Sequence, residues 1–313
     1  MSVTPGDLSP SVGLTAAAPS PSTTSDAPTL GVRRSRWQRT LRLLQRQPLG
    51  TIGLGIIVLL VLTAAFAPII APYDPTNTQF HRLLKPNVTN YFGSDNLGRD
   101  VYSRVIYGSR TSLEVGIIAT VVGVVGGTLV GLLSGYFGGW LDTVIQRAMD
   151  TLMAFPLLIL ALIMIAIVGA SVVNLMVVVG IAIIPPVGRI VRGIVLSEKQ
   201  NAYVEAARTI GAPPTRVLFV HILPNLLAPL IVVATSLLAG AILIEASLSF
   251  LGLGTPPPTP SWGADLSGEA RRYMTRAPWM AIFPGVALSL VVLGFNFLGD
   301  ALRDLLDPRL RGR

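Results

Sequence analysis

The sequence predicts an all-α membrane protein with six transmembrane helices. Hydrophobic residues make up 51% of the 313-residue chain, and charged residues make up only 13%. A soluble protein could not carry that balance without very large exposed apolar patches. In addition, six separate stretches are apolar over about the 20 residues that a helix needs to cross a bilayer. Glycine and proline are both frequent, with 31 and 24 residues, as transmembrane helices tolerate.

The six expected spans follow one another along most of the chain. They cover about residues 49–71, 112–137, 144–169, 172–187, 225–250 and 281–302. The fourth is short and ends at Pro185-Pro186, so its end is the least well defined. The remaining expected organisation is an N-terminal tail that is disordered and then basic (1–48), an outer segment (72–111), a core with spans two to six (112–302) that contains an inner loop (198–224) and an outer loop (251–280), and a C-terminal tail (303–313).

The basic residues give these spans an orientation. If the N-terminus lies in the cytoplasm, sixteen of the 24 Lys and Arg residues fall on the inner side and eight on the outer side. Basic residues are enriched in cytoplasmic loops, so we expect both termini in the cytoplasm. The same rule accounts for the net charge of +8. That charge lies beside apolar spans and therefore does not indicate binding to nucleic acid.

Enzymatic and metal chemistry receive no support from the sequence. The absence of cysteine excludes disulfides and cysteine-ligated metals, and the two histidines, His81 and His221, fall on opposite sides of the membrane in this topology. No Gly-x-x-x-x-Gly-Lys-Ser/Thr phosphate loop occurs, so the chain is not expected to hydrolyse ATP. A series of mid-membrane carboxylates, typical of proton- or sodium-coupled carriers, is also missing.

Few features inside the spans point beyond packing. Arg147 and Asp150 are three residues apart on a helix and could pair with each other. Glu245 has no local partner and is the best candidate for a pathway or gate residue. The alternative is a carboxylate at the outer interface that accepts hydrogen bonds from Ser247 or loop amides. Glycine recurs at every fourth residue in and after the second span, at Gly127, Gly131, Gly135 and Gly139. This repeat indicates either close packing of the span against a neighbouring helix or a translocation path lined by glycine.

The most informative segment is the inner loop between the fourth and fifth spans. Its Glu205-Ala-Ala run favours a helix, and Gly211 breaks that helix. Pro213 then suits the first turn of a second short helix, and Pro224 the first turn of a third. The segment therefore predicts a charged helix–turn–helix held at the cytoplasmic membrane face. A transporter could receive force from a separate motor at such a place.

The inner loop resembles the EAA loop of ABC-importer permeases, the element that docks on the ATP-hydrolysing subunits. The matching residues are Glu205, Ala206, Ala207, Gly211, Ile222, Leu223 and Pro224. Further segments are similar to the C-type permease subunit of dipeptide and oligopeptide importers: FGSDNLGRD (92–100), GYFGGW (135–140), DTLMAFP (150–156), EASLSFLGLG (245–254), PTPSWG (258–263) and GDALRDLLDPR (299–309). Together these matches run in order from about residue 49 to residue 309.

Two positions depart from the family pattern. His221 occupies the place of the usual isoleucine, and Ile222 directly precedes Leu223, an arrangement similar to that of the peptide-permease branch. Ala212-Pro213-Pro214 replaces the polar cap that is usual before the second short helix. This run of prolines is expected to stiffen the turn.

The resemblance implies a type I ABC importer permease fold with a cytoplasmic coupling helix, in the inner or plasma membrane of a bacterial cell. It implies that the chain forms half of a translocation pathway for dipeptides or oligopeptides, together with a second, homologous permease subunit in a heterodimer. Two ATP-binding domains, or one fused ATPase chain, would bind ATP and Mg, so no cofactor is expected in this chain. An extracytoplasmic substrate-binding protein would deliver the cargo.

Some alternatives stay open at this point. The outer segments 72–111 and 251–280 either dock the substrate-binding protein or merely cap the helix ends. The same permease role with haem, a nickel chelate or another small solute as cargo is the main alternative function. A secondary carrier or channel is a more remote one. Copurification of an ATPase subunit would separate it from an importer.

Overall fold

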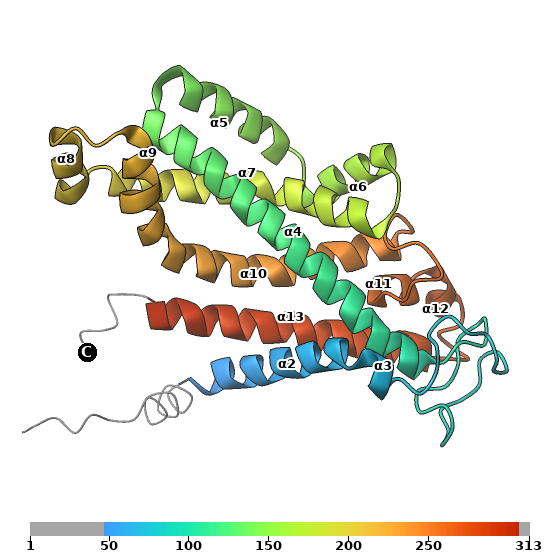
Figure 1. The fold of residues 1–313 in the computed structure, drawn as a ribbon. Helices are drawn as coiled ribbons and strands as arrows, with labels where there is room; N and C mark the ends of the chain where they lie inside the picture. Colours follow the sequence, from blue (N-terminus) through green and yellow to red (C-terminus); the bar gives the residue numbers. More distant parts are fainter. Residues whose placement is uncertain (1–46, 307–313) are drawn as a thin grey trace, which may run out of the picture. The chain divides into compact units, whose positions relative to one another are not determined.

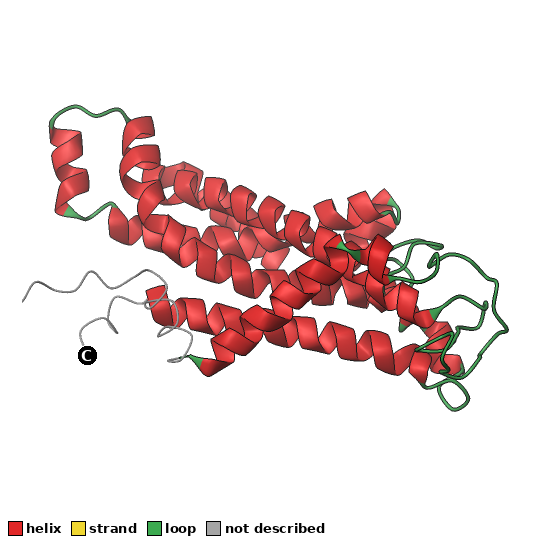
Figure 2. Cartoon of the chain, turned by 60° about the horizontal axis from the view of Figure 1, so that its bottom comes forward, coloured by secondary structure: helices red, strands yellow, loops and turns green. Residues whose placement is uncertain are grey.

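A computed structural model describes residues 47–306, and the regular elements in that range are helices (Figures 1 and 2). Ser94 and Asp100 form one isolated antiparallel bridge. Apart from this bridge, the described range contains no β-strand. The predicted all-α fold class is therefore confirmed. The expectations for residues 1–46 and 307–313 concern parts of the tails that lie outside the described residues.

Within residues 47–306, five helices are long and apolar enough to cross a membrane on their own. They are α2 (Pro48–Ala65), α4 (Val101–Phe137), α7 (Val172–Glu198), the continuous helix at 214–250 that contains α10 (Leu223–Phe250), and α13 (Trp279–Leu306). The expectation that a span ends at Pro185-Pro186 is wrong, because α7 continues past both prolines to Glu198. The two prolines remove backbone hydrogen bonds from α7, and α7 tolerates this loss because it packs against α4.

The expected third span at 144–169 is not a single helix. It forms α5 (Gly139–Met153) and α6 (Leu157–Val168), which are bent by 91° relative to each other. Pro156 causes the break, because it has no N–H to donate and disfavours helical backbone at the preceding Phe155. Taken together as one broken span, the pair supplies a sixth crossing of the membrane.

α4 and α7 pack closely because glycines line the contact. A Cβ atom on Gly127 would lie 2.5 Å from the Cβ of Val187, and one on Gly131 would lie 2.7 Å from the Cβ of Val191. Both distances are too short for real side chains, so this approach of the two backbones requires glycine. The packing interpretation of the glycine repeat is confirmed at these positions. Gly139, the last member of the repeat, lies instead at the start of α5.

α13 packs between α2 and α10 (Figure 1). The backbones of α2 and α13 approach closely at Gly53, where a Cβ atom would lie 2.8 Å from the Cβ of Phe297. Gln47 donates a hydrogen bond from Nε2 to Oδ2 of Asp304 (3.3 Å). The start of α2 therefore lies beside the end of α13.

The long helices define two ends of the bundle, which carry different short elements. The short helix α8 (Ala202–Thr209) lies at the end where α2 begins and α13 ends, here called the α8 end (Figure 1). The opposite end, here called the α11 end, carries three short helices: α3 (Ala67–Ile70), α11 (Trp262–Asp265) and α12 (Gly268–Arg272). The inner loop and the outer loop are thus separated by the length of the bundle.

Candidate functional site

The inner loop begins with α8 (Ala202–Thr209), whose end is fixed by backbone hydrogen bonds. The N–H of Ala212 donates to the carbonyl of Ala207 (3.0 Å), and the N–H of Gly211 donates to the carbonyl of Arg208 (2.9 Å). These two bonds form a Schellman motif, which requires a left-handed residue directly after the helix. Gly211 meets that requirement with a φ of 82°, which a residue without a side chain adopts at little cost. The predicted helix break at Gly211 is confirmed.

Side chains connect α8 to both helices that flank it in the sequence. Tyr203 donates from Oη to Oε2 of Glu198 at the end of α7 (2.5 Å), and accepts from Nδ2 of Asn225 in the first turn of α10 (2.8 Å). Partial burial raises the pKa of the Tyr203 phenol, and the hydrogen bond to Glu198 raises it further. The hydroxyl therefore stays a neutral donor and links α7 through α8 to α10.

α8 also contacts α4. The guanidinium carbon of Arg208 lies over the ring of Tyr136, 4.9 Å from its centroid, in a cation–π contact. Beside it, Lys199 donates from Nζ to the carbonyl of Gly135 (3.0 Å), which joins the end of α7 to the last turn of α4. α8 is thus linked through side chains to three membrane-spanning helices, so a displacement of α8 acts on all three.

The residues predicted for the inner loop divide into an exposed and a buried group. The exposed residues are Glu205, Ala206, Gly211 and Pro224, whereas Ala207 and Ile222 are buried and Leu223 is partly buried. Ile210, which the sequence did not single out, is 85% exposed. It follows Ala206 by four residues and accordingly lies on the same side of α8. Glu205, Ala206 and Ile210 therefore form the outward surface of the loop, which we call the α8 surface.

The second half of the inner loop differs from the expected pair of separate helices. One continuous helix is formed by α9 (Pro214–Arg216), the π-helix η1 (Val217–Ile222) and α10. Pro213 caps this helix and Pro214 is its first residue. Pro224 lies in the first turn of α10, as predicted. No turn separates Pro224 from α9, because η1 continues the helix between them. Within η1, the N–H of Leu223 donates to the carbonyl of Leu218, five residues earlier, as in a π-helix.

At the α11 end, Glu245 of α10 has no exposed surface. Its carboxylate accepts hydrogen bonds from four hydroxyl groups, here called the hydroxyl cage: Ser112 of α4 (3.3 Å), Ser249 of α10 (2.8 Å), and Thr255 (3.4 Å) and Ser261 (2.8 Å) of the outer loop. These bonds offset the cost of burying the carboxylate. Ser247 takes no part and donates instead to the carbonyl of Leu243 (2.7 Å). Glu245 thus joins α4, α10 and the outer loop.

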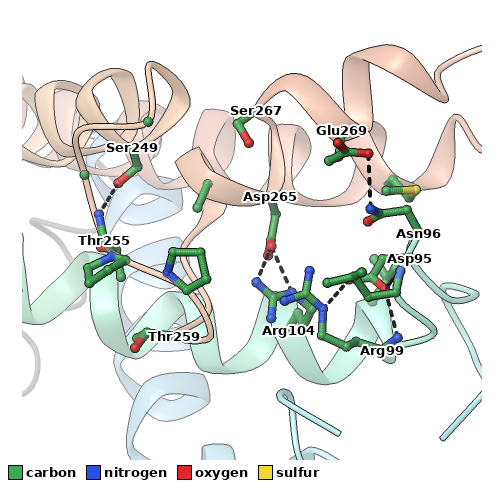
Figure 3. Close-up of a pocket in the computed structure, with 18 of the residues that line it drawn as sticks. Asp95, Asn96, Arg99, Arg104, Ser249, Thr255, Thr259, Asp265, Ser267 and Glu269 are labelled. Atoms are coloured by element: carbon green, nitrogen blue, oxygen red, sulfur yellow. Dashed lines mark hydrogen bonds and ion pairs between the residues drawn. The ribbon is translucent and has the colours of Figure 1, made fainter. Parts of the chain in front are cut away.

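A second buried polar contact joins the same elements. Arg104 of α4 donates from Nε to Oδ1 of Asp265 in α11 (2.8 Å). Its Nη1 donates to the carbonyls of Pro75 (3.1 Å) and Pro258 (3.4 Å). Figure 3 shows this ion pair on the wall of a cavity of about 390 Å³, near the hydrogen bond from Asn96 to Glu269. The loops at the α11 end are therefore fastened to α4 at two buried points.

Several of these residues could not be found from the sequence. Tyr203 and Asn225 are 22 positions apart, and Arg104 and Asp265 are 161 positions apart, so no local spacing marks either pair. The expected pairing of Asp150 with Arg147 is wrong, because Asp150 forms its ion pair with Arg189. α5 lies alongside α7, which brings Arg189 within reach.

Two family models match this chain. The one described as binding-protein-dependent transport system inner membrane component matches residues 127–312. The other, described as the N-terminal TM domain of oligopeptide transport permease C, matches residues 35–86. The first match alone covers more than half of the chain and includes the inner loop and Glu245.

Similar proteins match over nearly their whole length. The dipeptide transport system permease protein DppC of Alkalihalophilus pseudofirmus is 43% identical, over 88% of this chain and 91% of that protein. The glutathione transport system permease protein GsiD of Pectobacterium atrosepticum is 45% identical, over 89% and 93%. A chain of the MetNI methionine ABC transporter, solved in inward-facing conformations, is 22% identical with a TM-score of 0.54 over 65% of this chain and 96% of that chain. The structural likeness shows the fold.

Proposed function

We propose that this chain forms half of a peptide pathway through the bacterial cell membrane. The reason is that it belongs to the family of binding-protein-dependent transport system inner membrane components. The chain is a multi-pass permease subunit of an ABC importer, and it has the type I fold. Importers of this class work with separate ATPase subunits and a substrate-binding protein. ATP and Mg would bind to the ATPase subunits and not to this chain.

The observation that carries the coupling part of this proposal is the attachment of α8 to the ends of three spans. Tyr203 connects α8 to α7 and α10, and Arg208 connects it to α4. The α8 surface of Glu205, Ala206 and Ile210 would seat in a groove of an ATPase subunit. When ATP draws the two ATPase subunits together, α8 would follow, and the attached helices would open the pathway outward. Hydrolysis would then reset them.

The same proposal assigns the two ends of the bundle to the two sides of the membrane. The α8 end would face the cytoplasm, in agreement with the distribution of basic residues along the sequence. The α11 end would face outward and meet the substrate-binding protein. A second, homologous permease subunit would complete the pathway. Within this arrangement, Glu245 would act on the outer gate through the loop that it holds, since its carboxylate is fully buried in the subunit.

The cargo would be a dipeptide or a short oligopeptide. This follows from the similarity to a dipeptide permease and to the C-type oligopeptide permease model. Glutathione, itself a modified tripeptide, is the second candidate, because similarity to glutathione permeases is equally high. Both kinds of cargo carry at least one ammonium and one carboxylate group, so one pathway chemistry would serve either.

Uptake by the reconstituted complex tests the proposal. The chain would be purified with its permease partner, its ATPase subunits and its substrate-binding protein, and placed in liposomes. Uptake of a labelled dipeptide should require ATP, Mg and the binding protein, and should exceed uptake of labelled glutathione. Faster uptake of glutathione would transfer the assignment to that cargo. Dipeptide uptake that continues without ATP or without the ATPase subunits would contradict the importer mechanism.

A further inference from the structure

The ion pair between Asp150 of α5 and Arg189 of α7 is unusually open. The side chain of Asp150 is 54% exposed and that of Arg189 is 50% exposed. Among the described residues, this pairing is the one hydrogen bond found for either side chain. Both groups therefore retain capacity for a ligand: the second carboxylate oxygen of Asp150 and the remaining N–H groups of Arg189.

Both charged groups lie inside candidate membrane-spanning helices, Asp150 in the broken pair of α5 and α6 and Arg189 in α7. Asp150 follows the start of α5 at Gly139 by eleven residues, which is about 16 Å of helix. Arg189 precedes the end of α7 at Glu198 by nine residues, which is about 14 Å. The hydrocarbon core of a bilayer is about 30 Å thick. An exposed ion pair on a membrane-spanning helix cannot face the hydrocarbon core without a large cost, so it faces protein or water.

The surface around the pair is mixed, because exposed polar residues lie there beside exposed apolar ones such as Leu152, Phe155 and Ile190. The exposed residues of α5 near Asp150 include Thr143, Arg147 and Thr151, and the next exposed turn of α7 carries Gly193. Apart from its chain neighbours and the backbone of its own helix, nothing lies within 4 Å of the place where a Cβ on Gly193 would stand, so this position borders open space. In contrast, the exposed residues along the middle of α4 are all apolar: Val121, Val125, Leu129 and Leu133.

The broken span supplies a third, independent observation. The residues from Asp150 to Pro156 are all exposed, and the chain leaves helical structure between Met153 and Leu157. No side chain caps the start of α6. Backbone groups that lack helical partners are tolerated at membrane depth only where protein covers them or water reaches them. The break and the ion pair are five residues apart, so both point to the same aqueous surface.

We propose that Asp150 and Arg189 line the translocation pathway and bind the two charged ends of a zwitterionic peptide. The pair would open in passage, so that Asp150 holds the ammonium group and Arg189 holds the carboxylate. Guanidinium and carboxylate form strong charge-assisted hydrogen bonds. The ammonium group of the peptide would take the place of Arg189 beside Asp150, and the carboxylate of the peptide would take the place of Asp150 beside Arg189. This inference rests on the proposed peptide cargo and extends it to the residues that recognise that cargo.

The same two helices carry a second ion pair that serves as a matched control. Asp142 of α5 pairs with Arg192 of α7 through two hydrogen bonds (2.7 and 2.6 Å), and it also accepts one from Ser134 of α4. The side chains of Asp142 and Arg192 are only 17% and 30% exposed. This pair ties three helices together and has little capacity left for a ligand. It should matter for assembly and not for the choice of cargo.

Water access can be tested without any cargo, because the chain contains no cysteine. Thr151→Cys and Gly193→Cys should react in the assembled complex with a charged, membrane-impermeant thiol reagent, as measured by mass spectrometry of this subunit. Leu59→Cys, at a 64% exposed apolar position of α2, should not react. If both pathway cysteines are as inert as the one in α2, lipid or the second subunit covers this face. The proposal then fails, whatever the cargo proves to be.

Cargo recognition is tested with a dipeptide and its N-acetylated and C-amidated forms. Asp150→Asn should lower the preference for the free ammonium group about tenfold, and Arg189→Gln should do the same for the free carboxylate. Each preference is a ratio of uptake rates in one complex, and the unchanged binding protein contributes equally to the wild-type and variant ratios. The double variant Asp150→Asn/Arg189→Gln, which leaves no unpaired charge, should lose both preferences.

The less exposed pair of Asp142 and Arg192 provides the control in the same uptake assays. Asp142→Asn/Arg192→Gln should reduce the yield of assembled complex while the complex that forms keeps both preferences. Assembled Asp150 and Arg189 variants that keep both preferences unchanged would overturn the assignment. If the wild-type complex imports no peptide at all, the proposed cargo fails, and with it the recognition of peptide ends. The cysteine reactivity would still decide separately whether this face is aqueous.

Discussion

The two ends of the helix bundle are held together by different kinds of contact. At the α8 end, the links run through partly exposed side chains, such as Tyr203 with Glu198 and Arg208 with Tyr136. At the α11 end, the links are buried: the hydroxyl cage encloses Glu245 completely, and the side chain of Arg104 is only 5% exposed. A buried polar group that loses its partner costs about 1–3 kcal/mol, whereas exposed contacts contribute about 1 kcal/mol or less.

This difference indicates that the two ends of the bundle have different functions, although α4 and α10 run through both. α4 carries Tyr136 at one end and Ser112 and Arg104 at the other, and α10 carries Asn225 at one end and Glu245 at the other. A displacement received by α8 would thus reach an α11 end that moves as a unit with α4 and α10. Changes at the α11 end should destabilise the subunit, and changes at the α8 end should disturb coupling.

The largest effect is expected from Glu245→Ala. The change leaves the four hydroxyl groups of the cage without their acceptor and opens a cavity, which should cost about 3–5 kcal/mol. The melting temperature and the yield of the purified complex should both fall. Glu114→Ala, which removes an exposed carboxylate of α4, is the control and should leave both unchanged. Glu245→Gln keeps the shape of the side chain and should alter transport while the complex still assembles. Loss of assembly without a specific transport defect would remove Glu245 from the gate.

Gly211→Val should produce the next largest effect, and at the opposite end. Its φ of 82° strains a β-branched residue by about 1–2 kcal/mol or more, so the Schellman motif should be lost. Peptide imported per ATP hydrolysed should fall sharply, or the ATPase subunits should fail to bind, while the fold of the subunit persists. Gly55→Val is the control, because a side chain there meets open space. Normal transport per ATP in the Gly211 variant would contradict the coupling role.

A smaller effect is expected from Tyr203→Phe. The change removes one hydroxyl and with it the link between Glu198 and Asn225, worth about 0.5–1.5 kcal/mol per hydrogen bond. The complex should assemble normally, and transport per ATP should fall a few-fold. Tyr91→Phe removes a hydroxyl from a 58% exposed tyrosine at the α11 end and should change nothing. Equal behaviour of the two variants would mean that Tyr203 does not transmit the motion of α8.

The smallest effect is expected from Arg208→Ala. It removes the cation–π contact with Tyr136, which is worth about 0.5–1 kcal/mol at an exposed site. The affinity of the ATPase subunits for the permease pair should fall by about two- to fivefold, as measured by titration in detergent. Arg216→Ala, at an exposed position of α9, provides the comparison for loss of charge alone. An effect of the same size at Arg216 would assign the loss to charge and not to the contact with α4.

The sequence predicts the fold class because apolar length and composition are local properties. It also predicts the end of α8, because Gly211 adopts at little cost the left-handed backbone that often ends a helix. The sequence places Pro156 inside the expected third span, where a proline can kink a helix, but it does not predict the 91° bend between α5 and α6. An apolar run does not reveal whether a proline kinks a helix or ends it. The extension of α7 past Pro185-Pro186 was missed for the opposite reason, since packing against glycines of α4 overrides the local preference of proline.

The candidate sites show the same limit. Glu205 to Gly211 could be recognised because the pattern is contiguous, and Glu245 because a lone carboxylate stands out in an apolar span. The partners of Glu245 could not, since Ser112 lies 133 positions away and serine is common. The pairing of Asp150 with Arg189 depends on how α5 lies along α7, 39 positions apart in the sequence. Such contacts follow from the fold and not from spacing.

Crosslinking at the two ends of the bundle tests the central claim most directly. Ile210 at the α8 end is 85% exposed, and Val88 in the segment before α4 is 92% exposed. A photoreactive side chain introduced at each position of the assembled complex should give opposite products. Position 210 should crosslink to an ATPase subunit, and position 88 should not. Crosslinking of position 88 to the ATPase, or no ATPase product at position 210 in an intact complex, would contradict the assignment of α8 as the motor contact.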